Sequence, residues 1–254
     1  MKIGTGFGTL LWREVTRFFS VFSQTILPPI ISSFLYFSVF GLSIGSQIRE
    51  IDGVSYIRYL IPGLIMMYVI EGSYINTSSS LFISRWANYI EELLVTPLSY
   101  FEMVLAILLG GVVRGLVIAG GVALMSLFFV RFPIAHPFIM AFFLVFVSMV
   151  FSSLGIIIAL FAEEFEHLSI ANVFVITPLV FMGGVFNSIS MMPESLRWIA
   201  HINPIFYMVN GLRYGMIGMS DADLVKSAGV VAGLFFFLFG AAVYLFRIGF
   251  KLRK

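Results

Sequence analysis

Six long apolar runs constrain this chain more than any other feature of its sequence. A helix that crosses a bilayer needs about 20 predominantly apolar residues. Only 11% of the 254 residues are charged and 60% are hydrophobic, and a soluble fold of this size could not keep so much apolar surface from water. The sequence therefore predicts an all-α integral membrane protein, a single domain over residues 1–254 with six transmembrane helices. The runs cover about 25–45, 59–80, 103–130, 138–162, 170–188 and 227–247.

Residues 7–22 predict a helix of another kind. At 100° per residue, Leu10, Phe18 and Phe22 fall on one side and Arg13 and Arg17 on the other. A helix patterned in this way is suited to lie in the membrane interface. The alternative is a helix that packs on a soluble partner.

The basic residues orient the chain, because Lys and Arg are enriched on the cytoplasmic side of membrane proteins. Placing both termini in the cytoplasm puts residues 81–102 inside and residues 189–226 outside, where 196–199 and 205–209 predict short re-entrant or interfacial helices before the last span. The cytoplasmic set is then Lys2, Arg13, Arg17, Arg85, Arg247, Lys251, Arg253 and Lys254, and the outer set is Arg49, Arg58, Arg131, Arg197, Arg213 and Lys226.

Motifs for catalysis and for nucleotide binding are missing from the sequence. There is no GxxxxGK[ST] loop and no HExxH, and the absence of cysteine excludes thiolate metal sites. One E-x-x-H string, Glu164 to His167, lacks the second such string that a di-iron bundle needs. A net charge of +2 is too small to indicate a nucleic-acid partner. We therefore expect no enzyme activity, no metal and no cofactor in this chain, and any energy to come from a partner or an ion gradient.

The inner loop from Arg85 to Pro97 is the most informative stretch. Its pattern is helical and charged, and Pro97 stops it. A short helix parallel to the membrane would form a polar knob that fits a cleft on a cytoplasmic partner. The alternative is an interfacial hairpin between two spans.

The same loop resembles the coupling-helix region of the bacterial ABC type 2 permease family, in which an arginine precedes an acidic residue and a Leu-Leu-x-x-Pro pattern. The resemblance covers nearly the whole chain and is close to the YadH-like permeases. It departs at residues 88–90, where many relatives carry Gly-Thr, which could alter the bending of the knob. The residues that resemble the family's outer-loop signature are Gly183, Gly184, Pro193, Asn203, Pro204 and Arg213.

This resemblance implies the membrane-spanning permease subunit of an ATP-binding-cassette exporter in the bacterial inner membrane. It implies a homodimer bound to two copies of a separate ATPase, which would hold the ATP and Mg. The substrate would be an amphipathic or lipid-like molecule or a drug, moved out of the cytoplasm or the inner leaflet. The residues implied to contact the ATPase are Arg85, Asn88, Glu91, Glu92, Leu93, Thr96 and Pro97.

Two charges fall inside the predicted spans, where charges are costly and functional by default. Glu71 and Arg114 sit at similar depth on consecutive spans, and we expect them to pair, either as a fixed packing pair or on a transport pathway. Asn76 belongs to a polar stretch that could line a conduit or hydrogen-bond across helices. Gly111 and Gly115 form a GxxxG step for close packing, within one subunit or across a dimer.

Two other functions remain open at this level. An ion-coupled secondary transporter or channel could use Glu71, although the inverted repeats common in transporters are not evident. A membrane enzyme could use the acidic loop around His167, although a second ligand set is missing.

Overall fold

The computed structural model of the protein describes residues 3–44, 50–51, 53–131, 134–188, 191 and 193–252. Of the residues used to orient the chain, Lys2, Arg49, Arg253 and Lys254 lie outside the described residues. Two short strands, β1 (Glu50–Ile51) and β2 (Val54–Ser55), pair antiparallel. The helical elements are α1 (Ile3–Ser20), α2 (Phe22–Thr25), α3 (Leu27–Tyr36), the π-helical η1 (Phe37–Ile44), α4 (Tyr56–Trp86), α5 (Ile90–Leu94), α6 (Tyr100–Ser126), α7 (Pro137–Phe161), α8 (Phe165–Ala171), the π-helical η2 (Asn172–Ile176), α9 (Thr177–Phe181), α10 (Glu194–Ile202), α11 (Pro204–Ile217) and α12 (Leu224–Arg247).

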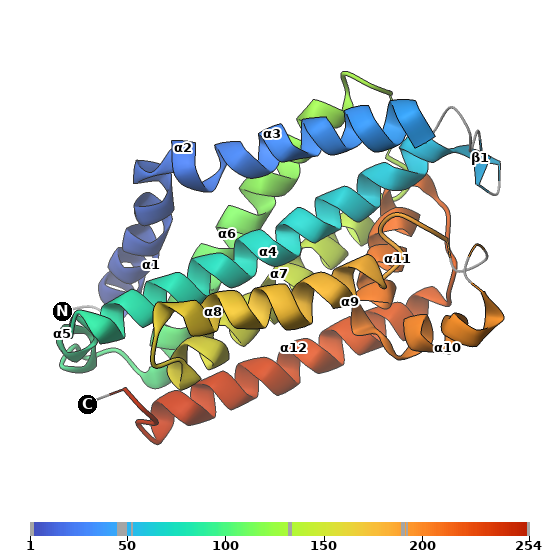
Figure 1. The fold of residues 1–254 in the computed structure, drawn as a ribbon. Coiled ribbons are helices and arrows are strands. Elements are labelled where there is room, and N and C mark those ends of the chain that lie inside the picture. The colour runs from blue at the N-terminus through green and yellow to red at the C-terminus, as the bar shows by residue number, and fades with distance from the viewer. Residues whose placement is uncertain are drawn as a thin grey trace.

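Helix α4 forms the centre of the bundle and packs most extensively against α7 and α6 (Figure 1). Its outer half is largely apolar and buried, and its inner half contains buried polar residues, including Ser73, Asn76 and Thr77. Small residues on the neighbours allow this, because they let backbones approach closely enough for hydroxyl groups to find partners. Thr77 Oγ1, for example, donates to the Ser152 carbonyl of α7 at 2.9 Å.

Four of the six predicted spans are confirmed as helices long and apolar enough to cross a membrane within the described residues, namely Phe22–Gly41, α6, α7 and α12. The run at 59–80 lies in α4, whose 31 residues suffice in length but whose polar inner half lowers its mean hydropathy. The fifth run starts earlier and ends sooner than predicted. It forms one apolar stretch, Phe165–Phe181, through α8, η2 and α9. The chain leaves the helix before Gly184, whose φ of +78° favours glycine.

The start of α1, helix α5 and the end of α12 lie at one end of the bundle, which we call the inner end (Figure 1). Strand β1 and helix α10 lie at the opposite, outer end (Figure 1). This arrangement agrees with an even number of crossings between the two ends of the described chain.

Helix α1 runs across the inner end instead of along the bundle (Figure 1). The predicted apolar side divides between two environments, because Leu10 and Phe18 are buried in the protein while Phe19 and Phe22 are exposed. Trp12 is 69% exposed. Part of the predicted apolar side therefore packs on α6 of its own chain, and the position of α1 in the membrane interface stays a prediction.

The outer segment before α12 is more deeply embedded than predicted. The stretch at 205–209 is part of α11, a 14-residue helix that packs against α7, α12 and α4 and is buried along most of its length. The stretch at 196–199 lies in α10, whose Trp198 and Ile202 are exposed. Only α10 resembles the interfacial helix that the sequence predicts.

Candidate coupling site and intramembrane polar centre

Helix α5 presents one face to the bundle and one to the outside. Ile90 and Leu93 are buried against the inner apolar cluster, whereas Glu91 and Glu92 are exposed. Val95, directly after the helix, is 81% exposed. The spacing of Ile90 and Leu93 produces this division, because residues three apart share a helix face. Leu93, which the sequence analysis places among the partner contacts, therefore faces the bundle instead.

The turn before α5 depends on Asn88, which has a φ of +63°. Glycine adopts this left-handed region without cost, and asparagine tolerates it better than most residues. Asn88 is therefore a residue suited to the positive φ that this turn requires. After the helix, Thr96 Oγ1 donates to the Leu93 carbonyl at 2.7 Å, and Pro97 stands exposed where the chain turns toward α6.

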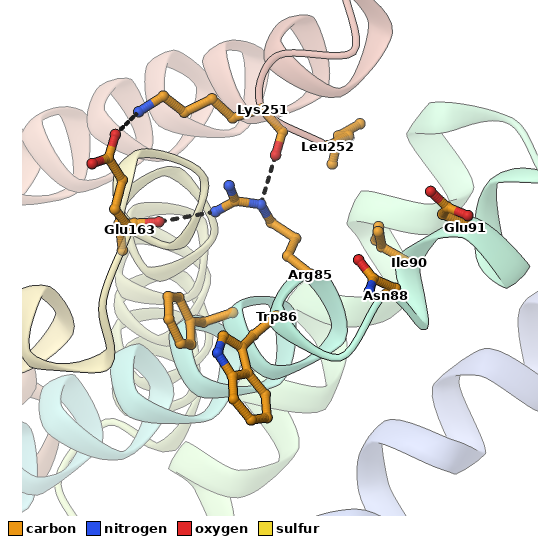
Figure 2. A pocket seen from close by; sticks show the side chains of 10 residues that line it. Arg85, Trp86, Asn88, Ile90, Glu91, Glu163, Lys251 and Leu252 are labelled. Carbon is orange, nitrogen blue, oxygen red and sulfur yellow. Dashed lines mark hydrogen bonds and ion pairs between the residues drawn. The ribbon is translucent and has the colours of Figure 1, made fainter. Parts of the chain in front are cut away.

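Arg85 fastens the base of this knob to two other parts of the chain (Figure 2). Its Nε donates to the Lys251 carbonyl at 2.6 Å, and its Nη1 donates to the carbonyls of Ala159 and Ala162 at the end of α7. The Arg85 guanidinium, which the family resemblance implies to contact a partner, is therefore occupied within the chain. Any direct contact of Arg85 with a partner stays a prediction.

A hollow of about 280 Å³ lies beside Arg85 at the foot of α5, and Asn88 and Glu91 form part of its wall (Figure 2). On its far side Lys251 Nζ contacts Glu163 Oε1 at 2.8 Å. This hydrogen bond lowers the pKa of Glu163 below its ordinary value. The pair is therefore charged at neutral pH and is lost as the pH falls through that lowered pKa.

A buried ionic cluster joins α1 to α4, and its central residue, Glu14, is not among the site residues predicted from the sequence. The Glu14 carboxylate is 1% exposed, accepts a hydrogen bond from Ser80 Oγ at 2.6 Å, and lies 3.1 Å from Arg13 Nη2 and 3.7 Å from Arg17 Nε. Arg17 Nη2 in turn donates to the carbonyl and to Oδ1 of Asn76 at 2.9 and 3.0 Å. One signal was available, since Glu14 lies one helical turn from both Leu10 and Phe18 and so shares their buried face.

The predicted ion pair between Glu71 and Arg114 is not formed among the described residues. Arg114 Nη2 donates to the Thr25 carbonyl at 3.2 Å, where α2 ends. Glu71 instead lines a cavity between α3, α4 and α9. The two residues have similar depth along their helices. Depth, however, does not determine toward which neighbouring helix a side chain points.

The glycine step of α6 acts within one chain. A Cβ atom on Gly111 would collide with Ser152 of α7, and one on Gly115 would collide with Ser73 of α4. Gly155 of α7 likewise faces Thr77. Of the two alternatives for the GxxxG step, the structure therefore supports packing inside a subunit.

Several outer-loop signature residues meet at the outer end. Arg213 is fully buried, with Nη2 donating to the Gly184 carbonyl at 2.6 Å and Nη1 lying 3.2 Å from Asp221 Oδ2. Its guanidinium also lies 3.8 Å from the centre of the Tyr59 ring, a cation–π contact to α4. These contacts fasten the turn after α9, helix α11 and the approach to α12 to one another.

The remaining signature residues shape helix ends. Asn203 caps α11 by accepting from the Ile205 N–H at 3.0 Å, and its Nδ2 donates to the Leu179 carbonyl of α9 at 2.6 Å. Pro204 follows at the first helical position, where its missing N–H costs nothing. Gly183 packs against Ile205, and Pro193 directly precedes α10. The E-x-x-H string also has a capping role, since His167 Nδ1 accepts from the backbone N–H of Glu163 at 3.2 Å.

The chain is similar in sequence to known membrane-transport proteins over most of its length. Residues 5–217 match the family profile described as ABC-2 type transporter. The inner membrane transport permease YadH of Escherichia coli (strain K12) is 41% identical over 222 residues, which cover 87% of each chain. Nodulation protein J of Rhizobium meliloti (strain 1021) is 23% identical over 215 residues, covering 82% of this chain and 78% of the relative. The protein of the same name from Neorhizobium galegae is 20% identical over 250 residues, covering 94% and 89%.

Proposed function

This chain belongs to the ABC-2 type transporter family as a multi-pass inner-membrane transport permease subunit, and we propose that it forms the membrane half of an exporter driven by a separate ATPase. In this proposal two copies of the chain bind two copies of the ATPase. ATP and Mg are held by the ATPase, and this chain binds no cofactor of its own. The substrate is an amphipathic or lipid-like molecule that leaves the cytoplasm or the inner leaflet.

The proposed topology has six crossings with both termini in the cytoplasm. The four long apolar helices supply four crossings. We assign the other two to α4, which is long enough, and to the apolar stretch Phe165–Phe181, which is short. The whole chain then acts as one domain, and its inner end faces the cytoplasm.

The observation that carries the proposal is the exposed acidic face of α5 at the inner end. Glu91 and Glu92 point away from the bundle, while Ile90 and Leu93 anchor the helix from below. A charged face held on a buried apolar base suits a docking element, because the base transmits a push into the bundle. Such a face fits a cleft with complementary charge on the ATPase.

Two sets of contacts connect α5 and the inner end to the transmembrane helices, so that a movement of α5 can be transmitted to them. The hydrogen bonds of Arg85 connect the foot of α5 to the end of α7 and to the segment after α12. The cluster around Glu14 connects α1 to α4 through Ser80. On this proposal, closure of the ATPase pair on ATP moves α5, and α4, α7 and α12 move with it from an inward-open to an outward-open arrangement.

Double charge reversal at the tip of α5 tests the proposal. The Glu91→Arg/Glu92→Arg variant is expected to insert in the membrane but to lose co-purification with its ATPase and substrate-stimulated ATP hydrolysis. The Glu50→Arg/Glu194→Arg variant makes the same charge change on exposed residues outside α5 and is the matched control. Unchanged co-purification of the α5 variant would reject docking through α5. Proton-coupled uptake by the chain alone would favour the ion-coupled alternative.

A further inference from the structure

The cavity beside Glu71 has the composition of a binding site. It encloses about 250 Å³ and is walled by α3, α4 and α9. Five of its lining residues carry polar groups and three are apolar. The polar set is Ser32, Tyr36, Tyr68, Glu71 and Thr177, and the apolar set is Met67, Val180 and Phe181.

The polar groups of this cavity are incompletely satisfied. Within the described part of the chain Glu71 has neither an ion pair nor a hydrogen bond, and Arg114 is directed to Thr25 instead. Tyr68 is 5% exposed, and in that same part of the chain its buried hydroxyl makes no hydrogen bond of ordinary geometry, although the Ser32 side chain lies beside it. A carboxylate and a phenol left without partners at membrane depth are both costly. A ligand that brings positive charge and N–H donors would relieve both.

The apolar part of the wall defines the rest of the ligand. Met67 and Phe181 offer a polarisable thioether and an aromatic ring beside the carboxylate. On α3 the neighbouring Ile31 and Leu35 are more than half exposed, so a lipophilic body can lie along that helix. The volume suits a small head group together with the first part of such a body.

We propose that this cavity binds the ammonium group of lipophilic amines, with Glu71 as the counter-ion and Tyr68 as a hydrogen-bond partner. This assigns a substrate class to the exporter and in that respect rests on the proposed function. The binding step itself does not, because it needs no ATPase.

Binding of one probe pair to the purified chain in zwitterionic lipid nanodiscs tests the proposal. The probe is N-dansyl-1,5-diaminopentane, which ends in an ammonium group, and its N-acetyl derivative keeps the apolar body without the charge. Fluorescence anisotropy, corrected with empty nanodiscs, gives both affinities. We expect the wild-type chain to prefer the ammonium form about tenfold or more, the range of a hydrogen bond to a charged group.

The variants separate Glu71 from charge in general. Glu71→Gln is expected to abolish the preference, Tyr68→Phe to reduce it severalfold, and Glu50→Gln, which removes an exposed carboxylate at the outer end, to leave it unchanged. Equal affinity of the wild-type chain for both probes would overturn the proposal, as would an unchanged preference in a folded Glu71→Gln variant. Should Glu71→Gln fail to fold, two results still test the proposal. An unaltered preference in Tyr68→Phe overturns the role of Tyr68, and equal affinity of the wild-type chain for the two probes overturns the ammonium site.

The same assay keeps this proposal separate from the proposed function. Ammonium-selective binding without ATPase co-purification would leave the site intact and reject the exporter. Co-purification of the ATPase without ammonium-selective binding would support the exporter and reject the binding site. A dimer that seals the cavity against the probe also counts against the site.

Discussion

Removal of the Glu14 carboxylate is the perturbation that we expect to loosen the inner end most. Glu14→Ala leaves the Ser80 hydroxyl without its partner and removes the negative charge between Arg13 and Arg17. Glu14→Gln keeps the shape and an oxygen acceptor but removes the charge. The first variant should therefore destabilise the protein more than the second.

The magnitude follows from the contacts of Glu14. A hydrogen bond to a charged group contributes about 1.5–3 kcal/mol. The two arginine side chains are 49% and 34% exposed, so solvent partly screens the two ion pairs, and each adds at most about 1 kcal/mol. We therefore expect Glu14→Ala to cost about 2–4 kcal/mol. At about 2–4 °C per kcal/mol for a chain of this length, Tm should fall by about 4–16 °C.

Thermal melting of the purified chain, followed by circular dichroism in one detergent, measures this loss. Glu92→Ala is the control, since it removes an exposed carboxylate and should move Tm by no more than about 2 °C. Combining Glu14→Ala with Ser80→Ala should cost less than the sum of the single changes, because the two side chains share one hydrogen bond. A Glu14→Ala variant that melts with the wild type, or strict additivity with Ser80→Ala, would refute the cluster as a structural tie.

Five further variants, in three experiments, probe the knob, the core and the topology. Asn88→Gly should keep both Tm and ATPase co-purification, whereas Asn88→Val should lower both, at a cost of about 1–3 kcal/mol for a β-branched residue at positive φ; equal behaviour of the two would exclude a role for the left-handed turn. Gly63→Ala should cost about 1–3 kcal/mol in the melting assay, because its Cβ would stand 2.9 Å from the backbone Cα of Val185, and a neutral result would contradict that close approach. Because the chain lacks cysteine, Glu92→Cys should react with a membrane-impermeant maleimide only from the cytoplasmic side and Glu194→Cys only from outside. The reverse pattern would invert the proposed orientation.

Local signals in the sequence predicted the elements of the fold well. Apolar length located the helices α6, α7 and α12 within a few residues. The charged, helical pattern between Arg85 and Pro97 located a short helix, and the structure has α5 there with Glu91 and Glu92 exposed. Helix length and helix-stopping residues depend on neighbours along the chain, so the sequence alone is enough to predict them.

The rotation of each helix about its axis could not be predicted in the same way. Glu71 and Arg114 share a depth, yet packing directs one toward α9 and the other toward Thr25. Arg213 was predicted to be a basic residue on the outer side of the membrane, whereas the fold buries it completely against Tyr59. These outcomes depend on which helices become neighbours.

Polar residues in α4 posed a related problem. Asn76 and its neighbours left a conduit and a packing role open, because a single helix does not reveal what covers it. The structure brings Arg17 to Asn76 and Ser152 to Thr77, so this stretch joins three helices through hydrogen bonds. Only the contacts between helices carry that information.

Site-specific photo-cross-linking from α5 in native membranes tests the central claim most directly. A photoreactive residue at position 92, on the exposed face of α5, should capture the ATPase subunit in high yield, and the same residue at position 194 on α10 should capture none of it. Capture from position 194 but not from position 92, or from neither position in a complex that transports, would contradict docking of the ATPase on α5.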